Sequence, residues 1–156
     1  SISSRYLPSS AKPIKRDWNV VRPEVLKRRL QKLDEYLSIV KKLSDYNQEE
    51  FVTEPERYGS AERFLQLSIE VINDMASHVV ADNELGTVTV SSDIPRLFQS
   101  SGYITDELCA KWIRLIGFRN ILVHDYLEVN RSIVHEVLRE SLNDIKELQR
   151  VFAQFL

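Results

Sequence analysis

The chain has 156 residues, a net charge of −2 and 43% hydrophobic residues, which is the size and composition of one folded domain. Its single cysteine, Cys109, excludes an internal disulfide framework and a cysteine-based zinc cluster. No apolar run reaches the roughly 18 residues of a membrane span. The four glycines are too few for the clusters that Rossmann and P-loop folds require. We therefore expect a single, largely helical cytoplasmic domain.

The charge is distributed unevenly along the chain. Residues 1–33 carry nine lysines and arginines against two acids, a net charge of +7, and the remainder carries −9. Because most of the chain is acidic, we do not expect it to bind nucleic acid over its whole surface. One basic edge is still enough to steer RNA to a small site. The simpler interpretation of Lys27, Arg28, Arg29 and Lys32 is the solvated face of an amphipathic helix.

The first long helix is expected to begin at Pro23, because the missing N–H of proline needs no partner at the first helical position. Residues 1–18 show no sustained periodicity and are expected to be an extension or an expression remnant, which leaves one helical domain over residues 19–156. The helix carries an apolar stripe at 4-3-4-3 spacing, formed by Leu26, Leu30, Leu33, Leu37 and Val40.

A second long helix is expected after a break in this periodicity. Asn47, Pro55 and Gly59 interrupt the first segment, with a short helical turn over residues 49–52. Ser60 is placed to cap the second helix with its hydroxyl. The broad apolar arc of that helix is typical of packing on two sides and contains Phe64, Leu65, Ile69, Val71, Ile72, Met75, Ala76, Val79 and Val80.

The second half of the chain predicts three more helices. The segment NELGTVTVSSD is expected to be a loop, because its alternating TVTV portion is too short to form a sheet. A short helix over residues 93–100 is closed by Gly102, and two longer helices are capped by Thr105 and Asn130. Together the elements predict an all-α bundle of four long helices and one or two short ones.

The stretch GFRNILVHDY carries the candidate chemistry. It contains Arg119, His124 and Tyr126 in an R-x4-H-x-Y pattern. A guanidinium binds phosphate through two parallel hydrogen bonds, and an imidazole both accepts and donates protons near neutral pH. These two groups suffice for RNA cleavage without a metal: the imidazole activates the 2′-hydroxyl, and the guanidinium stabilises the charged transition state.

An unbroken helix does not bring these side chains together. At about 100° per residue, His124 points about 140° away from Arg119, whereas Tyr126 shares the face of Arg119. A single site therefore requires that the helix ends near His124 and turns the imidazole back, or that a second copy of the motif faces the first across a dimer interface. One histidine per chain cannot be acid and base at once, so a symmetric dimer supplies both.

Polar residues near the motif are secondary candidates. Glu70, Asp74 and His78 are spaced four residues apart and share one face of the second helix. One interpretation is that they form a metal site or orient His124. The simpler interpretation is that they make a polar helix face or a hydrogen-bond network. Asn120 precedes His124 by four residues and is a candidate for fixing its ring.

Three other residues receive structural interpretations. His135, beside Glu136 on the last helix, is expected at the surface. Cys109 lies in an apolar helical setting and is expected to behave as a small hydrophobic residue. Trp112 is expected in the core or an interface, where it buries a large apolar surface.

The segment FRNILVHDYLEV, preceded by a capped helix and followed by an Asn-capped amphipathic one, resembles HepT-type toxins of the HEPN superfamily. The helix LQLSIEVINDMASHVV is similar to the second long helix of that family, and the resemblance covers about residues 22–156. It implies an all-α homodimeric ribonuclease of a type II-like toxin–antitoxin pair, in which Arg119 and His124 are catalytic without a cofactor and Asp74 supports the site.

The resemblance also implies a partner, an MntA-type minimal nucleotidyltransferase antitoxin. That enzyme uses ATP and magnesium to transfer AMP to the tyrosine of the motif, here Tyr126. Two other classes of function stay open. A non-catalytic helical bundle would bind nucleotide or a partner protein, and a structural dimerisation module would leave Arg119 pointing at solvent.

Overall fold

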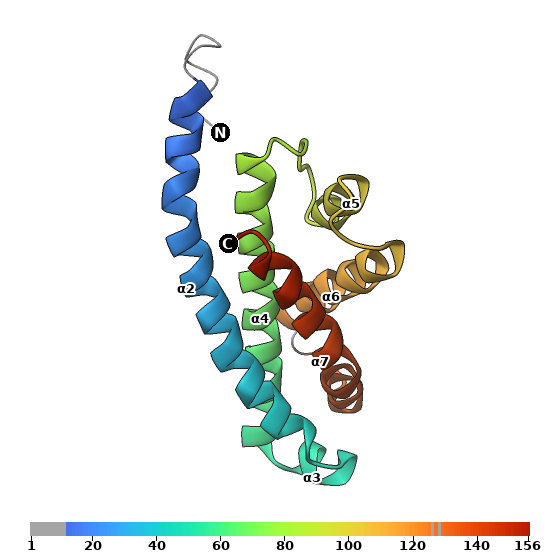
Figure 1. The fold of residues 1–156 in the computed structure, drawn as a ribbon. Coiled ribbons are helices and arrows are strands. Elements are labelled where there is room, and N and C mark those ends of the chain that lie inside the picture. Colours follow the sequence, from blue (N-terminus) through green and yellow to red (C-terminus); the bar gives the residue numbers. More distant parts are fainter. Residues whose placement is uncertain (1–11, 126, 128) are drawn as a thin grey trace.

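Four long helices form the frame of the protein, and two short helices join them (Figure 1). The computed structural model describes residues 12–125, 127 and 129–156, with side chains from Pro23 onward. The long helices are α2 (Lys12–Ser44), α4 (Pro55–Asp82), α6 (Asp106–His124) and α7 (Arg131–Ala153), and the short ones are α3 (Gln48–Thr53) and α5 (Asp93–Ser100). This part of the chain contains no strand. The predicted all-α bundle, with its four long helices, is confirmed.

The first helix begins earlier than the sequence predicts. α2 starts at Lys12, so Pro23 lies inside the helix and not at its first position. Residues 12–18, predicted to be part of an extension, are therefore helical, and residues 1–11 lie outside the described residues. Inside a helix, proline removes one hydrogen bond and its ring crowds the carbonyl group four residues earlier, at a cost of about 3 kcal/mol. The apolar stripe that follows, buried at Leu33 and Val40, anchors the helix beyond this point.

The connection between α2 and α4 is built by two helix-start signals. Asn47 ends the first segment as predicted and forms a capping box, in which its side chain accepts from the Glu50 N–H and the Glu50 carboxylate accepts from the Asn47 N–H. The prediction that Ser60 caps the second helix is wrong, because α4 begins at Pro55. Gly59 does not break the helix, since its cost of about 1 kcal/mol is small beside the burial that follows.

The core runs along α4, which packs against α2, α6 and α7. Figure 1 shows α2 alongside α4, with α5 and α6 on the other side of α4. The predicted apolar arc of this helix is confirmed, with Phe64 and Val71 partly buried at its edges. Each fully buried aliphatic side chain contributes about 1.5–3 kcal/mol. The buried members of the arc are Leu65, Ile69, Ile72, Met75, Ala76, Val79 and Val80.

Aromatic side chains attach α5 to α6 and α7. Phe98 lies edge-on to Trp112 and Phe152, with ring centroids 5.1 and 5.5 Å apart. Trp112 also donates from Nε1 to Asn73 Oδ1 at 3.0 Å, which satisfies its only polar atom. Trp112 therefore belongs to the core, as predicted, and so does the buried Cys109.

The predicted helix ends in the second half are confirmed. Gly102 has a φ of +82° just after α5, a conformation that favours glycine. The Thr105 side chain accepts from the Leu108 N–H at the start of α6. The Asn130 side chain accepts from Ser132 and Ile133 N–H groups at the start of α7. No described helix is both long and apolar enough to cross a membrane.

His135 is buried, contrary to its predicted surface position. Its side chain is 5% exposed and donates from Nε2 to the Tyr46 carbonyl oxygen at 2.8 Å. The ring packs against Phe51 of α3 with centroids 5.0 Å apart, whereas the next residue, Glu136, is exposed. A carbonyl partner makes burial of the imidazole possible, and the sequence pattern of α7 does not reveal that partner.

Candidate functional site

Arg119 and His124 of the R-x4-H-x-Y motif lie in the last two turns of α6. The helix ends at His124, and Asp125 closes it by donating its N–H to the Ile121 carbonyl oxygen at 2.9 Å. His124 and Asp125 are both exposed. The end of the helix is thus where the sequence predicts, while Tyr126 lies outside the described residues.

The Arg119 guanidinium points toward α4. Its Nη2 donates to Glu70 Oε1 at 3.3 Å, and its Nη1 donates to Asn120 Oδ1 at 3.2 Å. Both members of the ion pair are about one-third exposed, at 28% for Arg119 and 32% for Glu70. Such a pair contributes at most about 1 kcal/mol to stability. Its main consequence is that it fixes the direction of the guanidinium.

Glu70, Asp74 and His78 share one face of α4, as their spacing predicts. The Asp74 carboxylate accepts from Nε of Arg29 on α2, and His78 Nε2 lies 3.9 Å from Asp74 Oδ2. The two carboxylates therefore bind arginines from two different helices and do not converge on His124. Among the described residues, no group of three His, Cys, Asp or Glu side chains could hold a metal ion. Of the interpretations above, these contacts match the hydrogen-bond network.

A polar hollow of about 330 Å³ lies between α4, α6 and the loop that precedes α5. Its lining combines one guanidinium, two carboxylates, amides and hydroxyls with two isoleucine side chains. The guanidinium is the group in it that can bind a phosphate oxygen. The sequence analysis named Asn120 but missed Asn73, Ser77 and Ser91, although Asn73 and Ser77 continue the polar stripe of Glu70 and Asp74 at helical spacing. The lining residues are Glu70, Asn73, Asp74, Ser77, Ser91, Ile94, Ile116, Arg119 and Asn120.

The loop that carries Ser91 is held by the first residue of α5. Asp93 Oδ2 accepts from the N–H groups of Thr89 and Val90 at 3.0 Å each. These backbone hydrogen bonds lower the pKa of the Asp93 carboxyl. The loop is thereby fixed at the edge of the hollow.

His124 is not among the residues that line this hollow. It is exposed on a different side of α6 and shares that side with Gly117, seven residues earlier. One chain therefore brings Arg119, Asn120, Glu70 and Asp74 together but leaves the imidazole apart. Of the two routes to a single site, the end of the helix alone does not bring His124 to Arg119.

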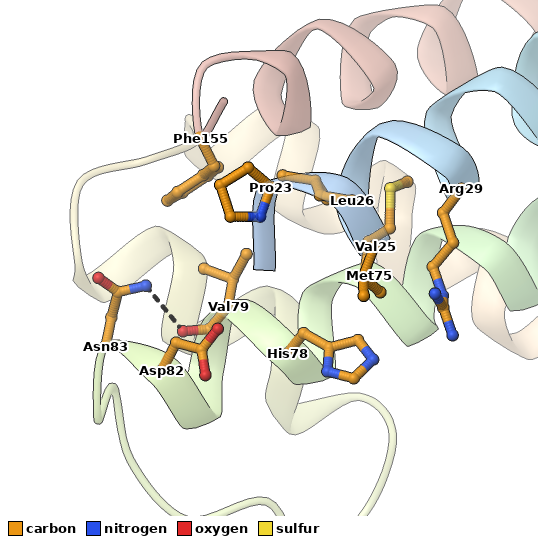
Figure 2. A pocket seen from close by; sticks show the side chains of 10 residues that line it. All are labelled: Pro23, Val25, Leu26, Arg29, Met75, His78, Val79, Asp82, Asn83 and Phe155. Atoms are coloured by element: carbon orange, nitrogen blue, oxygen red, sulfur yellow. Dashed lines mark hydrogen bonds between the residues drawn. The ribbon is translucent and has the colours of Figure 1, made fainter. Parts of the chain in front are cut away.

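A second, smaller pocket of about 170 Å³ lies between α2, α4 and the residues after α7 (Figure 2). Leu26, Val79 and Phe155 are among its apolar lining residues. Figure 2 shows Arg29 and His78 on one side of the pocket. Arg29 lines this pocket, and its ion-pair partner Asp74 lines the polar hollow.

Comparison with protein families gives one assignment for most of the chain. The model of a family described as Ribonuclease HepT-like matches residues 33–151. The mRNA nuclease HepT of Shewanella oneidensis is 35% identical over 83 residues, which cover 53% of this chain and 62% of that protein. The tRNA nuclease HepT of Aphanizomenon flos-aquae is 24% identical over 114 residues, covering 73% and 78%. The chain thus spans less than two-thirds of the length of the Shewanella relative.

Solved structures give a likeness over nearly the whole of their chains. A toxin–antitoxin crystal structure with AMP-PNP matches with a TM-score of 0.74 and 25% identity over 82% of this chain and 97% of that one. A tri-AMPylated Shewanella oneidensis HEPN toxin in complex with MNT antitoxin matches with a TM-score of 0.76 and 25% identity, over 83% of this chain and 97% of that one. The cytosolic protein YutE of Bacillus subtilis, at 15% identity and a TM-score of 0.74 over 86% and 90%, shares the fold.

Proposed function

The chain belongs to the HepT-like ribonuclease family, and on that premise we propose that it is a cytoplasmic toxin ribonuclease whose site uses Arg119 and His124 of a homodimer. The observation that carries the proposal is the position of Arg119. Its guanidinium is fixed at the wall of a polar hollow, on the same helix that ends at the exposed His124. The proposed substrate is an RNA phosphodiester.

The proposed reaction needs only these two kinds of side chain. A neutral His124 accepts the proton of the ribose 2′-hydroxyl, and the 2′-oxygen forms a bond to phosphorus as the bond to the 5′-oxygen breaks. The protonated His124 of the other subunit donates its proton to the leaving 5′-oxygen. Arg119 stabilises the negative charge that develops on the phosphate oxygens. The products are a 2′,3′-cyclic phosphate and a 5′-hydroxyl, and cleavage uses no cofactor.

The exposed side of α6 supports the homodimer. Gly117 lies within this helix, where glycine costs about 1 kcal/mol relative to alanine. No atom of the described residues lies within 4 Å of the position that a Cβ would occupy, so packing inside the chain does not require glycine here. Ile121, on the same side, is 46% exposed, and Ile133 at the start of α7 is 51% exposed. A second copy that approaches closely at Gly117 would cover this apolar surface.

Glu70 and Asn120 serve as positioning residues in this proposal. Both contact the Arg119 guanidinium. We therefore assign Asn120 to the arginine, whereas the sequence analysis offered it as a residue that fixes the histidine ring. Asp74 lies one turn after Glu70 on α4 and pairs with Arg29 of α2. Its effect on Arg119 is therefore indirect.

Neutralisation by AMPylation of Tyr126 completes the proposal. Relatives of the chain are toxins solved with an antitoxin, one of them AMPylated and one with AMP-PNP. An MntA-type partner would supply the nucleotide chemistry from ATP and magnesium. The added phosphodiester would place a negative charge two residues after His124, where it repels RNA phosphate and occupies Arg119.

Mass spectrometry after incubation with the partner and ATP tests this modification. Tyr126 should gain one or more AMP units, and Tyr126→Phe should gain none. AMP found on another residue, with Tyr126 unlabelled, would remove this part of the proposal.

Alanine substitution of each proposed catalytic residue tests the nuclease. Removal of Arg119 should lower the rate of RNA cleavage by about 10²–10³-fold. Removal of His124 should lower it by about 10²–10⁴-fold. Arg150→Ala, which removes an exposed guanidinium near the end of α7, is the matched control and should cleave like the wild type. Full cleavage by Arg119→Ala or His124→Ala would refute the assignment and favour the alternative of a non-catalytic bundle that binds nucleotide or a partner protein.

The alternative of a purely structural dimerisation module has less support. It predicts an Arg119 that points at solvent. The guanidinium is instead paired with Glu70 and lines the hollow.

A further inference from the structure

Two arginines from different helices reach the same face of α4. Arg29 of α2 donates to Asp74, and Arg119 of α6 donates to Glu70 at 3.3 Å. Glu70 and Asp74 are four residues apart on α4, so their side chains leave the helix about 6 Å apart on one face. α2 and α6 flank α4 on opposite sides (Figure 1), and Figure 2 shows Arg29 extending from α2 toward the side of α4 that carries His78. The second guanidinium therefore lies close to the proposed phosphate site.

The Arg29 guanidinium and its partner carboxylate are both partly exposed to solvent. The Arg29 side chain is 33% exposed, and that of its partner Asp74 is 47% exposed. An ion pair between groups that are this exposed is weak, because water screens both charges. Arg29 can therefore exchange the Asp74 carboxylate for the phosphate of a ligand without leaving a buried charge behind.

Residues 27–32 of α2 carry four basic side chains and no acidic one. Lys27, Arg28 and Lys32 are exposed on the same helix, and Lys32 is paired with Glu35 at 3.2 Å. These residues belong to the basic segment 1–33, whereas the rest of the chain is acidic. The acidic body repels a polyanion, so this edge of α2 is where an RNA backbone is attracted.

We propose that Arg29 is a second phosphate-binding residue, which takes a backbone phosphate beside the one at Arg119. We also propose that the basic face of α2 formed by Arg28, Arg29 and Lys32 is the surface on which the RNA lies. This inference rests on the proposed function, because it takes the phosphodiester at Arg119 as its reference point. Contacts to phosphate position a nucleic acid without reading its sequence. Asp74 holds Arg29 toward α4 in the absence of RNA and competes with phosphate for it.

If Asp74 and an RNA phosphate compete for Arg29, substitution of Arg29 and substitution of Asp74 should change the Kd for RNA in opposite directions. In the His124→Ala background, which prevents cleavage, Arg29→Gln should raise the Kd for a short fluorescent single-stranded RNA about tenfold. It should also reduce the slope of log Kd against log salt concentration by about 0.7, the value for one phosphate contact on a single strand. Asp74→Asn should lower the Kd, because it frees Arg29 and removes a negative charge. A merely structural ion pair would make both variants bind more weakly.

Lys41→Gln is the matched control. It also removes one positive charge from an exposed ion pair of α2, with Asp45 at 2.8 Å, about three turns from Arg29. The proposal is overturned if Arg29→Gln binds RNA with the same Kd and salt slope as Lys41→Gln, or if Asp74→Asn weakens binding. Either result leaves the nuclease standing when the wild type cleaves RNA. Conversely, loss of binding in Arg29→Gln together with full cleavage by Arg119→Ala refutes the catalytic assignment and retains this surface.

Discussion

The Glu70 carboxylate fixes the direction of the Arg119 guanidinium before the proposed substrate binds. It accepts from Arg119 Nη2 at 3.3 Å, and Gln66 Nε2 lies 3.3 Å from the same oxygen. A guanidinium that is already directed into the hollow loses less freedom when a phosphate binds. The Arg119–Glu70 pair can therefore contribute little to the stability of the fold and still have a large effect on the rate of cleavage.

Glu70→Gln should lower kcat about tenfold, because Arg119 loses its fixed direction. KM should stay the same or fall, since a negative charge leaves the site. The melting temperature should hardly change, because the pair is partly exposed. Steady-state cleavage kinetics and thermal unfolding measure these effects. Glu136→Gln, which changes an exposed carboxylate of α7, is the control. An unchanged kcat would show that Glu70 does not position the arginine.

Among the helices, α6 carries both the proposed catalytic residues and the proposed dimer contact. Gly117→Leu should weaken the dimer roughly tenfold or more, because a large side chain overfills a close contact. Gly59→Leu is the matched control, since Gly59 also lies in a helix with no atom within 4 Å of an added Cβ. Sedimentation across a dilution series compares the two variants. Equal dissociation of both would place the dimer contact elsewhere.

The sequence predicts the helices well where the signal is local. Thr105 and Asn130 accept from backbone N–H groups within three residues of themselves, so their capping role is visible in the pattern. Asn47 was predicted only to interrupt the first segment, and its capping box was missed. Ser60 failed as a cap because Pro55 supplies an earlier start. Pro23 failed as a start because the helix continues on both sides of it.

The long-range contacts of the site could not be predicted in the same way. The motif identifies Arg119, and helical spacing places Glu70 and Asp74 on one face. Which arginine each carboxylate binds depends on how α2 and α6 pack against α4, and Arg29 is 45 residues from its partner. His135 was misjudged for the same reason, since its partner carbonyl lies on a different part of the chain.

At the level of the whole molecule, a single chain does not bring the two proposed catalytic side chains together. Arg119 lines the hollow and His124 is exposed on another side of the same helix. The proposed dimer resolves this separation, because it brings two imidazoles and a guanidinium to one phosphodiester. The partner antitoxin and the RNA would then act on the same small region around the end of α6.

The activity of a heterodimer with one wild-type subunit and one His124→Ala subunit, purified through two different tags, tests this account most directly. If both imidazoles serve one phosphodiester, the heterodimer lacks either the acid or the base. Its cleavage rate should then be about 1% or less of the wild-type rate. A heterodimer that keeps half of the wild-type rate would mean that each chain carries an independent site, and would contradict the account.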